Sequence, residues 1–191
     1  MKKVALEDII GLAAYEKVRQ DARQKIIELK HRRRVSVGNN VTLVFENRDT
    51  VIFQIQEMMR AEKITDLDKI REEIEVYNEL IPAAGELSAT LFLEIEEQTH
   101  IREELLKFLG IDEALLLRVG SHSIRARFEE GHAKDDKISG VQYVKFPFSE
   151  QARQAFLSAE KAELVIDHPN YQATVEISNP TRRALIGDLA D

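Results

Sequence analysis

The stretch LVFENRDTVIFQIQEMMRAEKI, residues 43–64, decides how the N-terminal half of this chain folds. A strand-like apolar run ends at residues 47–49 (Asn-Arg-Asp), and a helical pattern begins directly afterwards. On a helix that turns about 100° per residue, five apolar side chains share one face. These are Val51, Ile52, Ile55, Met58 and Met59. The stretch therefore predicts a strand followed at once by an amphipathic helix.

The opposite face of this helix carries Phe53, so we expect the helix to be packed on two sides and its polar side chains to need partners. The polar groups of this region are Glu46, Asn47, Arg48, Asp49, Gln56, Glu57, Arg60 and Glu62. Carboxylates held close together can act as acid and base or bind a divalent metal. The simpler interpretation is structural, because Glu57 can pair with Arg60 three residues later and Asp49 can cap the helix.

Composition restricts the classes of function. The chain has 191 residues, a formal net charge of -7 and no cysteine. The negative charge disfavours nonspecific binding to nucleic acid or anionic lipid, and the lack of cysteine excludes thiolate metal sites, cysteine nucleophiles and disulfides. No apolar run reaches the roughly 18 residues of a membrane span, and acidic residues interrupt the N-terminal segment, unlike the apolar core of a signal peptide. We therefore expect a cytoplasmic protein that does not bind membranes.

The order of the expected elements predicts an α+β fold, with a mostly antiparallel sheet, a helix-rich N-terminal part and interspersed helices. Helices are expected at 6–32, from about 50, at 67–79, at about 99–109, from 150 and from 180. Strands are expected at 35–37, 41–45, 87–95, 115–119, 124–128, 141–148, 162–166 and 171–177. Residues 129–139 are polar without a pattern and are expected to form a loop. We interpret residues 1–191 as a single domain with a possible subdomain boundary near 82–86, where Pro82 and Gly85 stand.

Three histidines, His122, His132 and His168, are expected in turns or loops, where ligands often lie. Together with Glu57 and Glu62 they are the candidate ligands for iron, manganese or zinc, although no HxH or HExxH spacing is present. Our preferred interpretation is that the protein requires no cofactor, and a bound divalent metal is the alternative. For Asp167-His168 we expect a structural role in the turn that Pro169 and Asn170 form.

A basic run, His31-Arg32-Arg33-Arg34, follows the first long helix. It could contact phosphate, but the C-terminus of a helix presents carbonyl groups rather than anion-binding N–H groups, and the net charge opposes nucleic-acid binding. We therefore expect a solvated helix end or a surface for an acidic protein partner. Arg60 is a further candidate for such an interaction.

No GxGxxG, P-loop, GxSxG or kinase pattern is present, so nucleotide-dependent catalysis loses support, and no residue is identified as catalytic. The chain does resemble an uncharacterised bacterial family catalogued as a domain of unknown function. The similar stretches are RRRVSVGNNVTLVFENRDTV, IQEMMRAE, YNELIP, LRVG and DHPNY. The resemblance implies one compact domain. Members are often encoded beside rubrerythrin and an iron–sulfur oxidoreductase, which implies a role in oxidative-stress or redox metabolism.

Three hypotheses follow. The first is a non-catalytic accessory or binding protein that acts with a redox or metalloprotein partner, such as rubrerythrin or the iron–sulfur oxidoreductase, and that could also form a homodimer. The second is a metal-dependent enzyme or an iron-handling protein that uses Glu and His ligands. The third, nucleic-acid binding through the basic run, is disfavoured by the charge balance.

Overall fold

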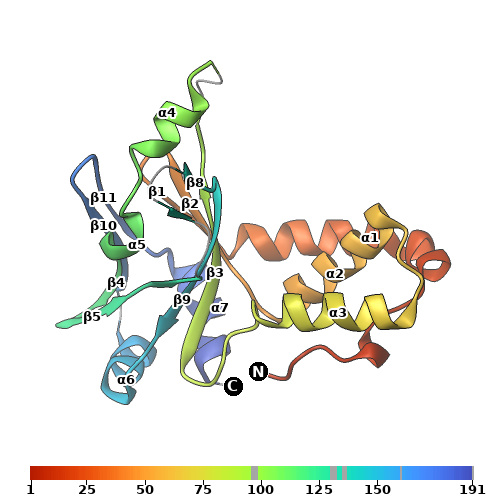
Figure 1. Ribbon diagram of the computed structural model, residues 1–191. Helices are drawn as coiled ribbons and strands as arrows, with labels where there is room; N and C mark the ends of the chain where they lie inside the picture. Colours follow the sequence, from red (N-terminus) through yellow and green to blue (C-terminus); the bar gives the residue numbers. More distant parts are fainter. Residues whose placement is uncertain (96–98, 130–132, 135–136, 160, 191) are drawn as a thin grey trace.

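A computed structural model describes residues 1–95, 99–129, 133–134, 137–159 and 161–190. The first part of the fold is a helical arm, which extends to one side of the molecule (Figure 1). It consists of η1 (Leu6–Asp8), α1 (Leu12–His31), α2 (Arg48–Glu62) and α3 (Leu67–Asn78). α1 and α2 pack against each other, and α3 packs against α2.

The second part, which we call the sheet body, contains two antiparallel sheets. The five-stranded sheet has the order β1 (Arg34–Val37), β2 (Val41–Phe45), β3 (Glu86–Leu93), β9 (Val141–Pro147) and β6 (Arg127–Phe128). The four-stranded sheet has the order β11 (Tyr171–Glu176), β10 (Glu163–His168), β4 (Leu115–Val119) and β5 (His122–Arg125). The remaining elements are α4 (Ile101–Leu106), α5 (Ile111–Ala114), the β7 (Ala133–Lys134) and β8 (Lys137–Ile138) ribbon, α6 (Glu150–Ser158) and α7 (Asn179–Ala190).

The two sheets share one hydrophobic core. Alternate residues of β3, namely Leu87, Ala89, Leu91 and Leu93, point into it, because successive side chains of a strand point to opposite faces. Phe156 of α6 and Leu185 of α7 belong to the same cluster. The other face of the five-stranded sheet carries Ser88, Thr90 and Phe92, and this face meets the helical arm.

The helical arm has a hydrophobic cluster of its own. Val51, Ile55 and Met59 of α2 pack there with Ile70 and Ile74 of α3. This cluster ends at Ile81, directly before the boundary predicted near 82–86. However, the β1–β2 hairpin stands earlier in the chain and belongs to the sheet body, so the chain passes between the two parts three times.

The predicted α+β class and the antiparallel pairing are confirmed. Several local predictions are wrong, and the strand expected at 124–128 is divided between β5 of the four-stranded sheet and β6 of the five-stranded sheet. Residues 133–134 and 137–138, expected in a loop, pair as β7 and β8, whereas 130–132 and 135–136 lie outside the described residues. α2 is capped by Asn47 rather than Asp49, since the Asn47 side chain accepts the Thr50 N–H at 3.0 Å. Finally, Asp167 and His168 belong to β10 and pair with β11, so the turn begins only at Pro169.

Candidate functional site

The junction between β2 and α2 brings the sheet body and the helical arm together, and Glu46, Asn47 and Thr50 shape it. Asn47 caps α2, and Thr50 completes a reciprocal capping box by accepting the Asn47 N–H at 3.0 Å. Glu46 precedes the cap and is buried, with 2% of its surface exposed. Its Oε1 accepts a hydrogen bond from the Thr90 hydroxyl at 2.6 Å, and its Oε2 accepts one from the Thr50 hydroxyl.

Glu57, a predicted metal ligand, is engaged by the neighbouring helix α1. Arg19 donates two hydrogen bonds to its carboxylate, at 2.7 Å and 2.8 Å, and the Tyr15 hydroxyl donates a third at 2.8 Å. These bonds, those from Arg19 first, lower the pKa of Glu57 to about 2. Burial and the Glu57 charge raise the pKa of Tyr15 above its usual range. The predicted neighbour Arg60 also contacts Glu57, at 3.7 Å, but as the weaker partner. The arrangement ties α2 to α1 and leaves Glu57 little capacity to bind a metal.

The other predicted ligands lie apart. Glu62 is exposed in the last turn of α2. His122 is partly exposed at the start of β5, in a hollow that Arg125 and Arg127 also line. His132 lies outside the described residues. Within the described ranges, no group of three His, Asp or Glu side chains is arranged to hold a metal ion.

His168 has a structural environment. It is 3% exposed, and its Nδ1 accepts the Asn170 N–H at 3.2 Å. Nε2 therefore carries the ring proton and donates to the Leu109 carbonyl, at 2.7 Å. Because both ring nitrogens are used, the side chain fastens the segment before α5 to the end of β10.

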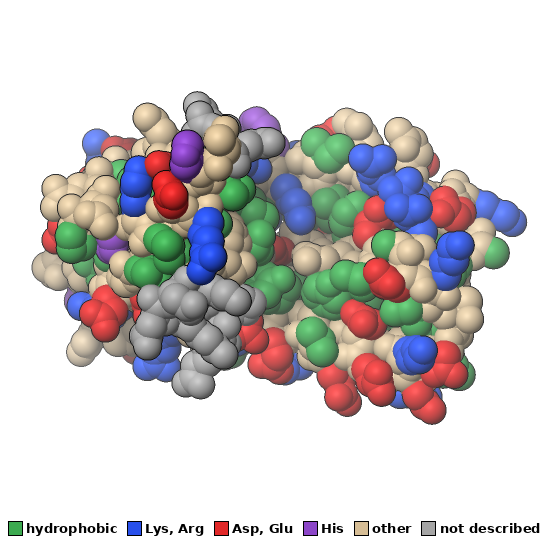
Figure 2. All heavy atoms as spheres, turned by 45° about the horizontal axis from the view of Figure 1, so that its top comes forward, with side chains coloured by type: hydrophobic (Ala, Val, Ile, Leu, Met, Phe, Trp, Pro, Cys, Tyr) green, Lys and Arg blue, Asp and Glu red, His purple; other side chains and the backbone are tan. Residues whose placement is uncertain are grey.

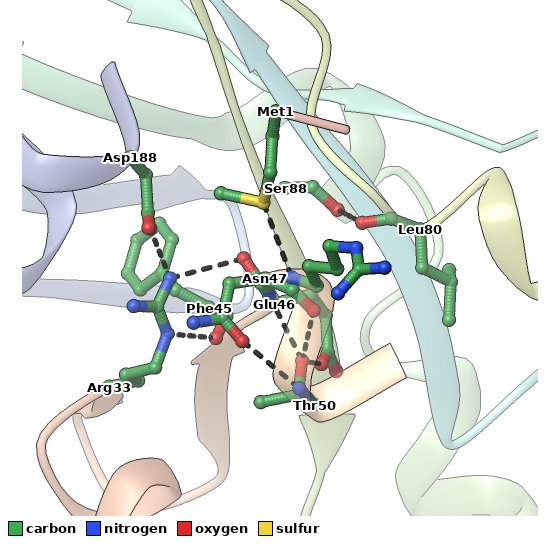
Figure 3. Close-up of polar contacts among 10 residues, drawn as sticks. Met1, Arg33, Phe45, Glu46, Asn47, Thr50, Leu80, Ser88 and Asp188 are labelled. Carbon is green, nitrogen blue, oxygen red and sulfur yellow. Dashed lines mark hydrogen bonds and ion pairs between the residues drawn. The ribbon is translucent and has the colours of Figure 1, made fainter. Parts of the chain in front are cut away.

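The basic run 31–34 is split between the surface and the interior. Arg33 is 2% exposed, donates to the Phe45 carbonyl at 2.8 Å and the Glu46 carbonyl at 3.1 Å, and pairs with Asp188 of α7 (Figure 3). His31, Arg32 and Arg34 are exposed, and Arg34 pairs with Glu94. Arg33 therefore joins the C-terminal helix to the junction and presents no surface to a partner.

Among the residues that the structure describes, two hollows are lined by side chains of both α1 and α2. The larger, which we call the α1/α2 groove, has a volume of about 520 Å³. The smaller, which we call the Glu46 hollow, has a volume of about 210 Å³ and lies where α2 meets the outer face of the five-stranded sheet. Hydrophobic side chains are visible along the furrow between the two parts of the molecule (Figure 2).

Arg19, Tyr15 and Tyr143 also belong to this region, although they were not among the predicted site residues. Tyr143 lines the Glu46 hollow from β9, and burial, followed by the charges of Glu129 and Glu46, raises its pKa. The alternation of apolar and polar residues at 141–148 indicates in part where Tyr143 lies, because it places this side chain on the face of the sheet that points away from the core. No local signal identifies Arg19, which stands 38 residues before Glu57.

Comparison with known proteins now identifies the family. A family model described as "Protein of unknown function (DUF3501)" matches residues 3–189. The chain belongs to the DUF3501 family. A crystal structure at 1.90 Å of a novel protein of unknown function from Burkholderia pseudomallei K96243 is 32% identical, with a TM-score of 0.92, and the alignment covers 98% of this chain and 100% of that one. No curated protein matches the sequence.

The described helices of this DUF3501 member include none that is long and apolar enough to cross a membrane. The TM-score of 0.92 shows that this protein shares its fold with a solved relative of unknown function.

Proposed function

We propose that this protein is a non-catalytic accessory protein that binds a redox or metalloprotein partner through the α1/α2 groove. The observation that carries the proposal is the groove itself, a hollow of about 520 Å³ that opens to solvent although most of its lining is apolar. Val18 is 46% exposed there, and Ile10 is 41% exposed. A contiguous apolar hollow on a protein surface is typical of an interaction site.

The shape of the groove favours a helix as its occupant. Val18, Ala22, Ile26 and Leu29 of α1 follow one another at spacings of three or four residues and form one wall. This wall covers three turns, about 16 Å at 1.5 Å per residue. Ile52 and Phe53 of α2 form the facing wall. An amphipathic helix of three to four turns lays its apolar stripe into such a groove.

The rim of the groove carries charges of both signs. Asp8 and Asp49 contribute carboxylates, and Lys25 and Arg32 contribute cations. A hydrogen bond from the Ala5 backbone, followed by one from Arg48, lowers the pKa of Asp8, so its charge persists in mild acid. We therefore infer a partner helix with both basic and acidic residues beside its apolar stripe. Arg32 retains the partner-contacting role predicted from the basic run, and Arg33 does not.

The choice of partner rests on the family resemblance, which implies a role beside rubrerythrin and an iron–sulfur oxidoreductase. Glu57 is hydrogen-bonded to Arg19 and Tyr15, and both ring nitrogens of His168 are hydrogen-bonded to backbone groups. These bonds support a non-catalytic role for the two side chains. Metal analysis of protein purified without chelator tests the alternative of an iron-, manganese- or zinc-dependent protein. Stoichiometric metal would overturn the non-catalytic proposal.

The direct test is isothermal titration calorimetry of the purified protein against purified rubrerythrin and against the purified iron–sulfur oxidoreductase. We expect one of them to bind, and we expect Val18→Glu to weaken binding by at least about tenfold, or 1.4 kcal/mol. Val76→Glu is the matched control, because Val76 is 67% exposed on α3 and lies outside the groove.

Two results would overturn the proposal. One is the absence of binding to both proteins, and the other is equal loss of binding in the Val18 and Val76 variants. Sedimentation analysis tests whether the protein self-associates through the groove. If it does and Val18→Glu abolishes the self-association, the occupant of the groove is a second copy of the chain.

A further inference from the structure

The Glu46 hollow borders the α1/α2 groove, with which it shares Phe53, but the rest of its lining and its chemistry are different. Its floor is the outer face of the five-stranded sheet, with Val44, Thr90, Phe92, Val141 and Tyr143. Its wall comes from the helical arm, where Lys30, Phe53, Gln54 and Glu57 line it, and Glu46 closes the junction between floor and wall. Hollows where two parts of a fold meet, with a few converging polar groups, are preferred sites for small ligands.

The Glu46 carboxylate is buried, and the groups that donate hydrogen bonds to it are the hydroxyls of Thr50 and Thr90. No cation lies within ion-pair distance of it among the residues that the structure describes. Its two oxygens are bonded to threonine hydroxyls, and the hydroxyl of Thr50 also lies 2.9 Å from the Asn47 carbonyl. A hydroxyl has one hydrogen, so Thr50 cannot donate fully to both acceptors. A buried carboxylate without a counter-charge is costly, and a cation entering the hollow would offset that cost.

Aromatic side chains make the hollow suitable for an organic cation. Phe53, Phe92 and Tyr143 line it from three different elements, α2, β3 and β9. Aromatic rings attract ammonium groups through the negative potential of their faces, and several rings around one site recognise alkylated ammonium groups. The methyl or methylene groups of such a ligand would also contact Val44 and Val141.

A metal ion fits this donor set less well. Divalent calcium and magnesium bind six or more oxygen ligands, whereas here the oxygens of Glu46 already accept hydroxyl groups and much of the remaining lining is aromatic or aliphatic. The second carboxylate, Glu57, is held by Arg19 and Tyr15 from α1. Lys30 is the native cation at this hollow, and its ammonium group is not within ion-pair distance of either carboxylate.

We propose that the Glu46 hollow binds a small alkylammonium compound, with the ammonium group against the Glu46 carboxylate and the alkyl groups among Phe53, Phe92 and Tyr143. A volume of about 210 Å³ limits the ligand to a head group with a short chain. Lys30 competes electrostatically with this ligand.

The test is isothermal titration calorimetry of the full chain with tetramethylammonium and choline at millimolar concentration, compared with 3,3-dimethyl-1-butanol, the uncharged carbon analogue of choline. Binding of the cations and not of the alcohol is expected. Glu46→Gln should weaken binding at least about tenfold, and Lys30→Met should strengthen it. Glu62→Gln is the matched control, because Glu62 is exposed in the last turn of α2 and lies outside the hollow.

Two further variants keep the proposal testable if Glu46→Gln does not fold. Val141 is 39% exposed at the hollow, so Val141→Lys should fold and should exclude the cation by charge and size. Phe92→Leu keeps an apolar side chain but removes a ring, and should weaken binding several-fold. The proposal is overturned if neither cation binds, if the neutral alcohol binds equally well, or if manganese binds stoichiometrically and Glu46→Gln or Val141→Lys abolishes that binding.

Discussion

The guanidinium of Arg19 faces the carboxylate of Glu57 through two parallel hydrogen bonds, from Nε to Oε1 at 2.7 Å and from Nη2 to Oε2 at 2.8 Å. This two-pronged geometry is the strongest arrangement for an arginine and a carboxylate. The Tyr15 hydroxyl completes it at 2.8 Å, so one side chain of α2 binds two side chains of α1. The wall-to-wall spacing of the α1/α2 groove therefore depends on a contact between residues distant in sequence.

Replacing Glu57 by Gln should lower the free energy of unfolding by about 1–3 kcal/mol, because charge-assisted bonds to Arg19 and Tyr15 are lost. Urea unfolding monitored by circular dichroism measures this change. Asp68→Asn is the control, since the exposed Asp68–Arg71 pair should contribute less than about 1 kcal/mol. Equal effects of the two substitutions would show that the Glu57 cluster contributes no more than a surface ion pair.

The same cluster predicts a pH dependence. The pKa of Glu57 falls from the ordinary 4.5 to about 2 in the folded protein. Glu57 therefore contributes stability that is fully present above pH 4.5 and is lost as the pH falls towards 2. Unfolding of the wild type and of Glu57→Gln should be compared across this window. The difference between the two proteins should shrink as the pH falls, and a constant difference would contradict the ionic origin of the contact.

Asp188→Asn should be among the most damaging polar substitutions, because it leaves the buried Arg33 guanidinium without its carboxylate. Removal of one member of a buried ion pair costs about 3–5 kcal/mol. Thermal unfolding provides the measurement. Glu176→Gln is the matched control, since Glu176 pairs with Lys161 at 3.2 Å on an exposed surface and should change stability by less than about 1 kcal/mol. A near-neutral Asp188→Asn would mean that α7 is not fastened through Arg33.

His168→Ala should destabilise the fold by about 1–3 kcal/mol without changing the metal content of the purified protein, since both imidazole nitrogens serve backbone groups. Metal analysis and thermal unfolding of the same samples separate the two readouts. His122→Ala serves as the comparison, because this partly exposed residue should alter stability by about 0.5 kcal/mol at most. Loss of a stoichiometric metal in the His168 variant would restore the predicted ligand role.

Gly38→Ala tests how the β1–β2 turn contacts β11. Gly38 has a φ of +70°, and a Cβ there would lie 2.3 Å from the Tyr171 hydroxyl oxygen. That hydroxyl donates to the Val37 carbonyl at 2.6 Å and accepts the Asn40 N–H at 3.0 Å. The left-handed conformation alone costs about 1–2 kcal/mol for alanine, and the overlap adds to it. Gly120→Ala isolates the overlap, since Gly120 also has a positive φ but no atom within 4 Å of its Cβ, and equal losses would exclude a contribution from Tyr171.

Local sequence determined the elements of this protein. The alternation at residues 87–95 predicted β3, the apolar period after Asn47 predicted α2, and Asp66 and Ser149 cap α3 and α6 as polar residues before a helix do. These features depend on neighbours within about four residues, and hydrogen bonds or side-chain periodicity over that distance can be recognised in a single sequence. The antiparallel α+β class followed from the order of the elements alone.

Only the tertiary structure decided the roles of the polar side chains. The basic run gave no indication that Arg33 would be buried against Asp188, 155 residues later, while Arg32 stays exposed. Nor could the sequence show that Glu57 would be held by Arg19, or that Glu46, Phe92 and Tyr143 would line one hollow. The role of a charged or aromatic side chain depends on its partners and on its solvent exposure, and both are set by tertiary packing. The partners lie in segments far away along the chain, so no local sequence pattern identifies them.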